Sequence, residues 1–239
     1  ILNTIDLQYN LTFHHLDRRS INIVLSIFQK FDVFLFPHAN RGGKYDMLFS
    51  LIRASKIVIP KQNSRNLVYH LSKEVEYVCD KEVHKVNYYR SFAQLPDIYE
   101  YDILQNKLSP SKIIAISPGS GEVEQHKRLS SLQWAQLIDL IKNQFPEMRI
   151  IVFHSHNEID LFTEIASFCS ANIENYIPNS IKDSLSFLKT VQFSIAVCNG
   201  ASHLASLLNI PCLGIYGPTN PSFTGLFGKR NRIYRLNYK

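Results

Sequence analysis

The sequence has few cysteines and no long apolar run, and these two shortages exclude several classes of protein. Among its 239 residues are four cysteines, Cys79, Cys169, Cys198 and Cys212, and no two of them form a Cys-x-x-Cys pair. Neither a disulfide scaffold nor a metal site is therefore predicted, and free thiols in a reducing compartment are expected. No apolar run reaches the roughly 18 residues that a membrane-spanning helix needs.

Other signals of special sequence classes are missing too. The first residues show no basic segment followed by an apolar one, so no secretory signal peptide is predicted. No internal repeat or low-complexity segment is found. Hydrophobic residues make up 45% of the chain and charged residues 19%, a composition that supports a packed core rather than disorder. One large or two modest globular domains are expected.

The charge balance is basic, with a formal net charge of +6. Such a balance favours an anionic substrate or contact with a polar membrane surface, or it serves solubility alone. The basic residues Lys229, Arg230 and Arg232 are interpreted as a solvated face, and no nucleic acid partner is predicted.

Short apolar runs alternate with amphipathic ones along the chain. Strands are predicted at residues 32–37, 56–60, 112–117, 149–153, 193–197 and 212–216, and helices at 46–54, 66–79, 158–169 and 203–208 and after the caps Ser130 and Ser180. Strands alternating with helices predict an α/β fold with doubly wound parallel sheets. A polar, tyrosine-rich stretch at 81–107 is typical of an interdomain connection, so domains over 1–105 and 106–239 are predicted.

Three polar loops follow strands in the second half of the chain. They cover residues 117–121 together with Lys127 and Arg128, then 154–158, then 198–203. The carboxyl ends of parallel strands meet at one edge of a sheet, where ligands bind in open α/β folds. We therefore expect the three loops to line one crevice.

Two of these loops offer donors to an anion. The turn Ser117-Pro-Gly-Ser-Gly121 presents backbone N–H groups and two hydroxyls, and Lys127 adds a mobile charge, although an ordinary turn is the alternative. It is neither Gly-x-Gly-x-x-Gly nor a Walker loop. Gly200 begins a second anion site at the start of a helix. Two such sites in one crevice predict a diphosphate.

Single polar residues in the crevice have a binding and a structural interpretation. His203, in the first turn of its helix, would donate to the diphosphate, or it is a half-buried structural histidine. Glu158 would bind ribose hydroxyls, or it is a helix-start acid favoured by the macrodipole. His154 and His156 are expected at the surface.

In the first half of the chain, one polar loop follows a predicted strand. It carries Asn40, Arg41 and Lys44, which would contact a phosphorylated or acidic acceptor across the cleft. An ordinary polar loop is the alternative.

Taken in order, three motifs resemble glycosyltransferase family 9, the lipopolysaccharide heptosyltransferases. They are Ser-Pro-Gly-Ser-Gly followed by Lys-Arg and Trp-Ala-x-Leu, then the run 198–211, then Tyr-Gly-Pro-Thr-Asn-Pro at 216–221. The resemblance covers about Ile113 to Thr224 and, more weakly, Phe31 to Pro60. It implies a GT-B architecture with two Rossmann-like domains, a donor site in the C-terminal one, an acceptor site in the other, no metal and no cofactor.

The resemblance also implies an inverting sugar transfer, typically from ADP-heptose, to a lipid-linked core sugar. On the family pattern Lys127 contacts donor phosphate and Glu158 holds the ribose. The predicted donor-binding residues are Ser117, Gly119, Ser120, Lys127, Glu158, Asn199, Gly200, Ala201 and His203, and the predicted acceptor-binding residues are Asn40, Arg41 and Lys44. A cytoplasmic protein with peripheral contact to the inner membrane is expected.

Two departures from the family pattern keep an alternative open. Cys198 stands where the pattern has Asp, and cysteine cannot accept two sugar hydroxyl bonds as a carboxylate can. The N-terminal Gly-Asp loop that supplies the family's base is not found, so no catalytic residue is assigned and the N-terminal domain is expected to be incomplete. The alternative is a catalytically silent sugar-nucleotide-binding or scaffold homologue. An epimerase shares the two-domain plan, but no acid pair supports that chemistry.

Overall fold

The computed structural model of the chain describes residues 30–35, 53–60, 74–78, 84–92, 111–122 and 124–236. Contacts between residues divide the chain into two units, Ile1–Lys81 with Tyr88–Pro96 and Glu82–Asn87 with Asp97–Lys239. The domain boundary predicted near residue 105 stays a prediction.

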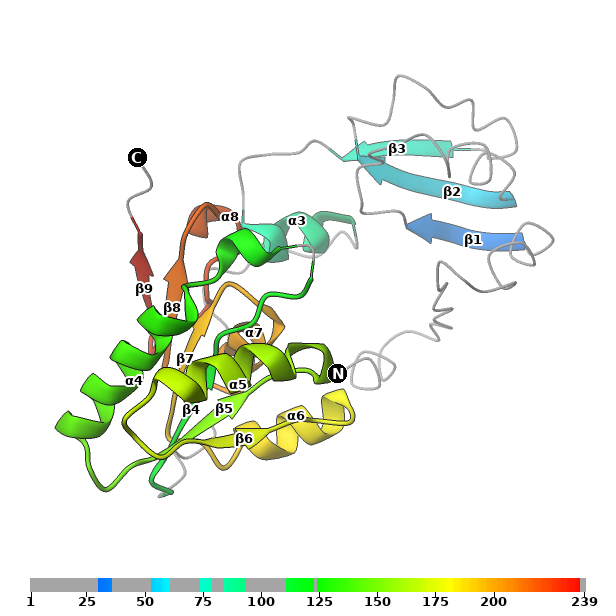
Figure 1. The fold of residues 1–239 in the computed structure, drawn as a ribbon. Coiled ribbons are helices and arrows are strands. Elements are labelled where there is room, and N and C mark those ends of the chain that lie inside the picture. The colour runs from blue at the N-terminus through cyan, green and yellow to red at the C-terminus, as the bar shows by residue number, and fades with distance from the viewer. Residues whose placement is uncertain are drawn as a thin grey trace. The chain divides into compact units, whose positions relative to one another are not determined.

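The first unit contains a three-stranded parallel sheet (Figure 1). Its strands are β1 (Lys30–Leu35), β2 (Arg53–Pro60) and β3 (Glu74–Val78), in the order β1-β2-β3. In the middle strand, Ala54, Ile57 and Val58 are buried, as expected of a strand with neighbours on both sides. The strands predicted at 32–37 and 56–60 are confirmed over the described residues.

Two helix predictions in this part of the chain are wrong. Residues 74–78, inside the helix predicted at 66–79, form β3 and pair in parallel with β2. Valine and tyrosine at positions 75, 77 and 78 favour a strand once a neighbouring strand offers hydrogen bonds, although their spacing also fits a helix. Arg53 and Ala54, inside the helix predicted at 46–54, begin β2. The other residues of both ranges lie outside the described part. Within the predicted connection, residues Lys85–Phe92 form helix α3.

The second unit is built on a six-stranded parallel sheet with the order β6-β5-β4-β7-β8-β9. Its elements, in chain order, are β4 (Ile113–Ser117), the 3-10 turn η3 (Gln125–Lys127), α4 (Ser131–Gln144), β5 (Arg149–Phe153), the 3-10 turn η4 (His156–Glu158), α5 (Ile159–Phe168), β6 (Glu174–Tyr176), α6 (Ile181–Leu188), β7 (Phe193–Val197), α7 (Gly200–Leu207), β8 (Cys212–Tyr216), α8 (Pro221–Thr224) and β9 (Arg232–Arg235). The predicted α/β fold with parallel strands is confirmed.

Helices cover both faces of this sheet. Trp134 and Ile138 of α4 and Ile165 of α5 pack on one face. Figure 1 shows the helices α4 and α5 side by side on that face. Phe187 of α6 and Ala205 of α7 pack on the other. Every strand from β4 to β8 except the short β6 has at least four of its five residues buried, so the sheet interior is rigid. Its carboxyl edge is therefore a fixed platform for loops.

Caps determine where the helices begin. Ser130 caps α4 as predicted, and it forms a capping box with Gln133. Asn199 caps α7, since its side-chain oxygen accepts a hydrogen bond from the N–H of Ser202 at 2.9 Å. This cap makes α7 begin at Gly200, three residues before the helix predicted at 203–208.

Candidate functional site

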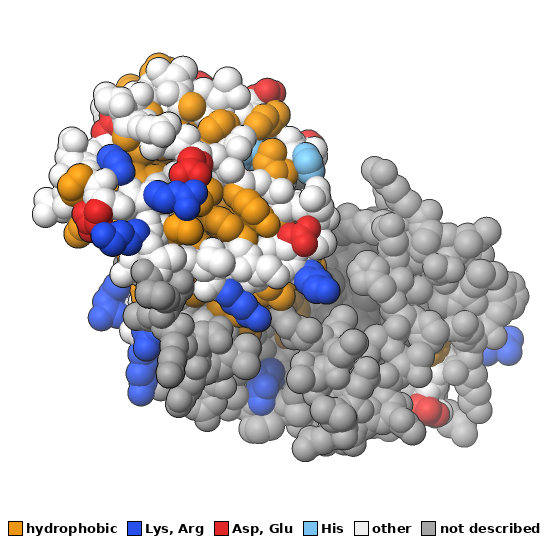
Figure 2. All heavy atoms as spheres, turned by 90° about the horizontal axis from the view of Figure 1, so that it is seen from below, with side chains coloured by type: hydrophobic (Ala, Val, Ile, Leu, Met, Phe, Trp, Pro, Cys, Tyr) orange, Lys and Arg blue, Asp and Glu red, His pale blue; other side chains and the backbone are white. Residues whose placement is uncertain are grey.

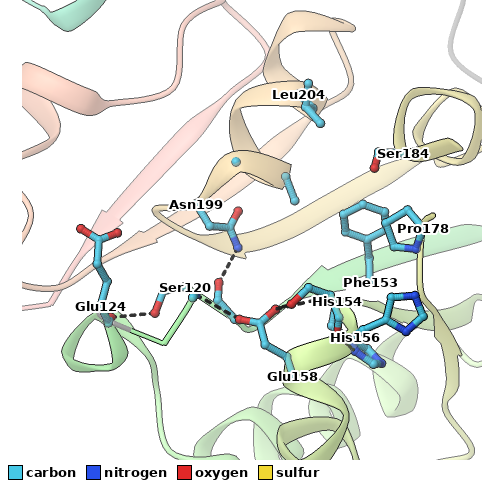
Figure 3. A pocket seen from close by; sticks show the side chains of 15 residues that line it. Ser120, Glu124, Phe153, His154, His156, Glu158, Pro178, Ser184, Asn199 and Leu204 are labelled. Carbon is cyan, nitrogen blue, oxygen red and sulfur yellow. Dashed lines mark hydrogen bonds between the residues drawn. The ribbon is translucent and has the colours of Figure 1, made fainter. Parts of the chain in front are cut away.

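The loops after β4, β5 and β7 meet at the carboxyl edge of the sheet, because these strands are neighbours in the order β5-β4-β7. They line one cavity of about 500 Å³, a volume typical of small-ligand sites. Figure 3 shows Asn199 and Glu158 reaching toward the first loop from opposite sides. The convergence expected from the sequence is confirmed. Six of the predicted donor-binding residues line the cavity: Gly119, Ser120, Glu158, Asn199, Gly200 and Ala201.

Glu158 joins the first two loops through its carboxylate, and the residue is only 8% exposed. Oε1 accepts hydrogen bonds from the N–H of Gly121 and from Arg128 Nη2, both at 3.1 Å. Oε2 accepts from the N–H of Ser155 at 3.2 Å and from its Oγ at 2.9 Å. A carboxylate has about four acceptor positions, and these bonds use them all. The interaction of Glu158 with a ribose stays a prediction, whereas its hydrogen bonds to both loops are observed in the structure.

The ionised form of Glu158 is favoured by these contacts. Burial raises the pKa of Glu158, but hydrogen bonds from Gly121 and Ser155 and the charge of Arg128 together hold that pKa below its usual range. Glu158 therefore carries its negative charge in the folded site.

Acid should weaken the fold through this residue. Because the folded pKa of Glu158 is depressed, its stabilisation is complete above the unfolded pKa of about 4.3 and is lost as pH falls through the folded value. We expect the urea concentration at the unfolding midpoint of the wild type to decrease as the pH is lowered past about 4.3. The midpoint of Glu158→Gln should decrease less over the same pH range. The exposed Glu147→Gln control should follow the wild-type curve, and a Glu158→Gln curve parallel to wild type would contradict this role.

Gly119 is required by the position of this carboxylate. A Cβ at Gly119 would lie 2.0 Å from Glu158 Oε1 and 2.2 Å from its Cδ. The same glycine presents its carbonyl oxygen to Asn199, whose Nδ2 donates to it at 2.7 Å and to the Ser117 carbonyl oxygen at 3.2 Å. Asn199 thus connects the first loop to the third, as Glu158 connects it to the second.

Three predicted donor-binding residues do not line the cavity. The Ser117 hydroxyl is buried and has no hydrogen-bond partner in the described structure. Lys127 Nζ lies 2.6 Å from Oε1 of Glu124, and it is Glu124 that lines the cavity. His203 is exposed in the first turn of α7. Partial desolvation of its ring lowers the pKa of His203, and the nearby charges of His84 and Lys127 lower that pKa further. Lys127 and His203 are therefore electrostatic neighbours beside the cavity.

The sequence missed the apolar wall of the cavity. Phe153, Pro178 and Leu204 line it, and Phe153 stacks on Phe187 with ring centroids 5.5 Å apart. No local motif marks these residues, because they come together only through packing of α6 and α7 on the sheet. The one available signal was Phe153 as the last residue of a predicted strand.

The prediction that His154 lies at the surface is wrong, whereas His156 is exposed as expected. His154 is 3% exposed and its ring stacks on Phe162 of α5 at 5.5 Å. It follows directly on β5 and continues the inward alternation of that strand.

The predicted acceptor-binding residues Asn40, Arg41 and Lys44 lie outside the described residues. Within the part of the chain that the structure describes, no group of three or more His, Cys, Asp or Glu side chains could hold a metal ion.

A family model described as glycosyltransferase family 9 (heptosyltransferase) matches residues 56–239, more than half of the chain and all three of these loops. The chain belongs to this family. Two curated relatives are named lipopolysaccharide heptosyltransferase 1. The one from Pseudomonas aeruginosa is 38% identical over 69 residues, 28% of this chain and 19% of the relative. The one from Campylobacter coli is 30% identical over 111 residues, 45% of this chain and 32% of the relative. The chain thus spans less than a third of the length of the relatives it matches.

Solved structures of the family share the fold. The E. coli heptosyltransferase WaaC with ADP matches with a TM-score of 0.65 and 19% identity, over 90% of this chain and 69% of that one. A glycosyltransferase family 9 structure from Veillonella parvula matches with a TM-score of 0.65 and 13% identity, over 86% and 62% of the two chains. These similarities confirm the α/β fold of GT-B type.

Cys198 is placed differently from the next three residues of the third loop. It is buried at the end of β7, and its Sγ lies 3.6 Å from Thr224 Oγ1 in α8. It is not among the residues that line the cavity, whereas the next three residues are. The thiol therefore faces protein in this structure.

Proposed function

We propose that this chain is a glycosyltransferase that moves a heptose or related sugar from a nucleoside diphosphate donor to a lipopolysaccharide-core or related glycan. The transfer would invert the anomeric centre and need no metal ion. The observation that carries the proposal is the single cavity lined by all three loops of the family pattern. An ADP-sugar is the first donor to test, because a structural relative was solved with ADP. The acceptor would be lipid-linked and reached from the cytoplasmic side of the inner membrane.

The proposed chemistry rests on stabilising the leaving diphosphate. As the bond to the sugar breaks, negative charge builds on the nucleoside diphosphate, and fixed donors that face it lower the barrier. The N–H groups of Gly200 and Ala201 lie in the first turn of α7, where a helix leaves donors without intrahelical acceptors. Lys127 and His203 lie beside that helix start and would add charge and a further donor.

The apolar wall would hold the nucleobase. Phe153, Pro178 and Leu204 face the cavity on the side away from Glu124, as Figure 3 shows. An aromatic and an aliphatic surface gain from burying a planar base, while the polar loops take the phosphates. This division supports a nucleotide rather than a free sugar phosphate as the ligand.

Lys127→Ala should weaken nucleotide binding by about 1–3 kcal/mol, the scale for losing a hydrogen bond to a charged group. Calorimetric titration with ADP-, UDP-, GDP- and CMP-sugars measures this and ranks the donors. Lys112→Ala removes an exposed lysine outside the cavity and should bind like the wild type. Equal affinity of Lys127→Ala and wild type would remove Lys127 from the site, and no binding by any sugar nucleotide would overturn the proposed function.

Glu124→Gln should strengthen nucleotide binding up to about fivefold, because the Glu124 carboxylate competes with phosphate for Lys127. The carboxylate is half exposed, so the pair is worth at most about 1 kcal/mol. Glu122→Gln is a matched control two residues away, where the carboxylate contacts Asn157 instead. The same titration measures both variants, and equal gains in both would show a general charge effect rather than release of Lys127.

The alternative function is a catalytically silent member that binds a sugar nucleotide within a glycan-assembly complex. Cys198, facing Thr224 where the family pattern has Asp, favours it. A sugar-transfer assay on the chain decides between the two. Binding without turnover supports the silent homologue, and turnover excludes it.

A further inference from the structure

The C-terminal end of the sequence carries positive charge without compensating acids. Asp183 is the last acidic residue, and no Asp or Glu occurs from residue 184 to 239. Five cations fall between 229 and 239, namely Lys229, Arg230, Arg232, Arg235 and Lys239. The first four belong to the described structure, in β9 and the turn before it. We call residues 229–235 the basic edge.

The basic edge lies at the border of the sheet. β9 pairs with β8 on one side, and no described strand pairs with its other side. All four residues of β9 are exposed, with Ile233 at 40% and Tyr234 at 60%. Figure 2 shows Lys and Arg side chains (blue) at several places on one face of the described part, with Asp and Glu (red) beside some of them.

Two guanidinium groups of this edge, those of Arg230 and Arg232, contact backbone oxygens rather than carboxylates. Arg232 Nη1 donates to the carbonyl oxygens of Asn231 at 3.0 Å and Lys229 at 3.2 Å. Arg230 Nη1 reaches the carbonyl oxygen of Asn209 at 3.5 Å. No carboxylate in the described part of the chain pairs with Arg230, Arg232 or Arg235. Their positive charge is therefore available to an external anion.

We propose that the basic edge binds the surface of an anionic lipid bilayer. An edge strand that carries only charges is explained by protection against pairing with another strand. This edge also exposes Ile233 and Tyr234 between its arginines, which that explanation does not require. Arginines bind lipid phosphates while tyrosine and isoleucine enter the interfacial layer. An isoleucine gains little against nucleic acid, so the composition favours lipid. The proposal goes beyond the proposed function, because no residue of β8 or β9 lines the cavity.

Vesicle sedimentation tests this surface. The chain should bind phosphatidylglycerol-rich vesicles and not pure phosphatidylcholine vesicles, and added salt should release it. The triple variant Arg230→Glu, Arg232→Glu, Arg235→Glu should lose at least about fivefold in partition for each cation removed, roughly a hundredfold in all. Lys112→Glu, Lys182→Glu, Lys189→Glu makes the same change of net charge at exposed sites elsewhere in this unit and should bind nearly as the wild type does.

Further outcomes decide between lipid and its rivals. Tyr234→Ser should lower vesicle binding several-fold while leaving the salt dependence unchanged. Equal losses in both triple variants would overturn the proposal, as would a single-stranded oligonucleotide that binds as tightly as the vesicles at the same ionic strength. The urea midpoint of the arginine variant, followed by the fluorescence of the buried Trp134, should match the wild type, which shows that the variant folds. Failure of all sugar nucleotides to bind would overturn the proposed function and leave this test intact.

Discussion

Replacing Glu158 with alanine should lower the free energy of unfolding of the second unit by about 3–5 kcal/mol, the scale for removing one partner of a buried ion pair. Its carboxylate is the shared acceptor for Gly121, Ser155 and Arg128. Without it, the Arg128 side chain, only 16% exposed, loses its counterion, and two backbone N–H groups lose their acceptor. The loss should be large because several partners fail together.

Urea unfolding followed by tryptophan fluorescence measures this effect, since the single tryptophan, Trp134, is fully buried in the same unit. Glu147→Ala removes an exposed carboxylate of that unit and should change stability by less than about 0.5 kcal/mol. Replacing both charges, Glu158→Leu with Arg128→Met, should recover part of the loss, because no charge is then left unpaired. A loss below about 1 kcal/mol in Glu158→Ala would show that the loops hold without the carboxylate.

Gly119→Ala should cost about 3 kcal/mol, the upper end for overpacking a tight site. The added methyl would lie 2.0 Å from Glu158 Oε1, so the carboxylate must move away and release its partners. Gly200→Ala is the matched control in the third loop, because a Cβ there meets nothing within 4 Å. That variant should stay within about 0.5 kcal/mol of the wild type.

The two substitutions should not be additive. Once Glu158 is alanine, the Gly119 methyl has no carboxylate to displace, so the double variant should be little worse than Glu158→Ala alone. The same urea experiment gives all four free energies of the cycle. Full additivity would mean that Gly119 is required for another reason.

The sequence predicted the place of the site because that place follows from topology. Apolar runs identified β4, β5 and β7, and parallel strands put their carboxyl ends at one edge, so three loops had to meet. The Ser130 cap was also readable, because its partner Gln133 is local. Features set by neighbours in sequence were therefore predictable.

Features set by distant partners were not. Two of the four hydrogen bonds of Glu158 come from Gly121 and Arg128, 37 and 30 residues away, and no spacing rule encodes these long-range contacts. β3 was predicted as a helix because its valines fit both periods, and pairing with β2 decided between them. The start of α7 depends on the Asn199 side chain, which caps the helix at Gly200, whereas the apolar pattern alone predicted a start at 203.

Asn199 has a consequence for which sequences this site can accept. A helix cap ordinarily tolerates Asp, Ser or Thr, since each supplies an acceptor to the first turn. Here the same side chain must also supply N–H donors, because two carbonyl oxygens of the neighbouring loop, those of Ser117 and Gly119, face it. Aspartate would keep the cap and turn negative charge toward both carbonyls. Asn to Asp, a conservative exchange at most helix starts, is thus a substantive change at this one. The Asn199 amide positions the helix and the loop relative to each other, because it hydrogen-bonds to both.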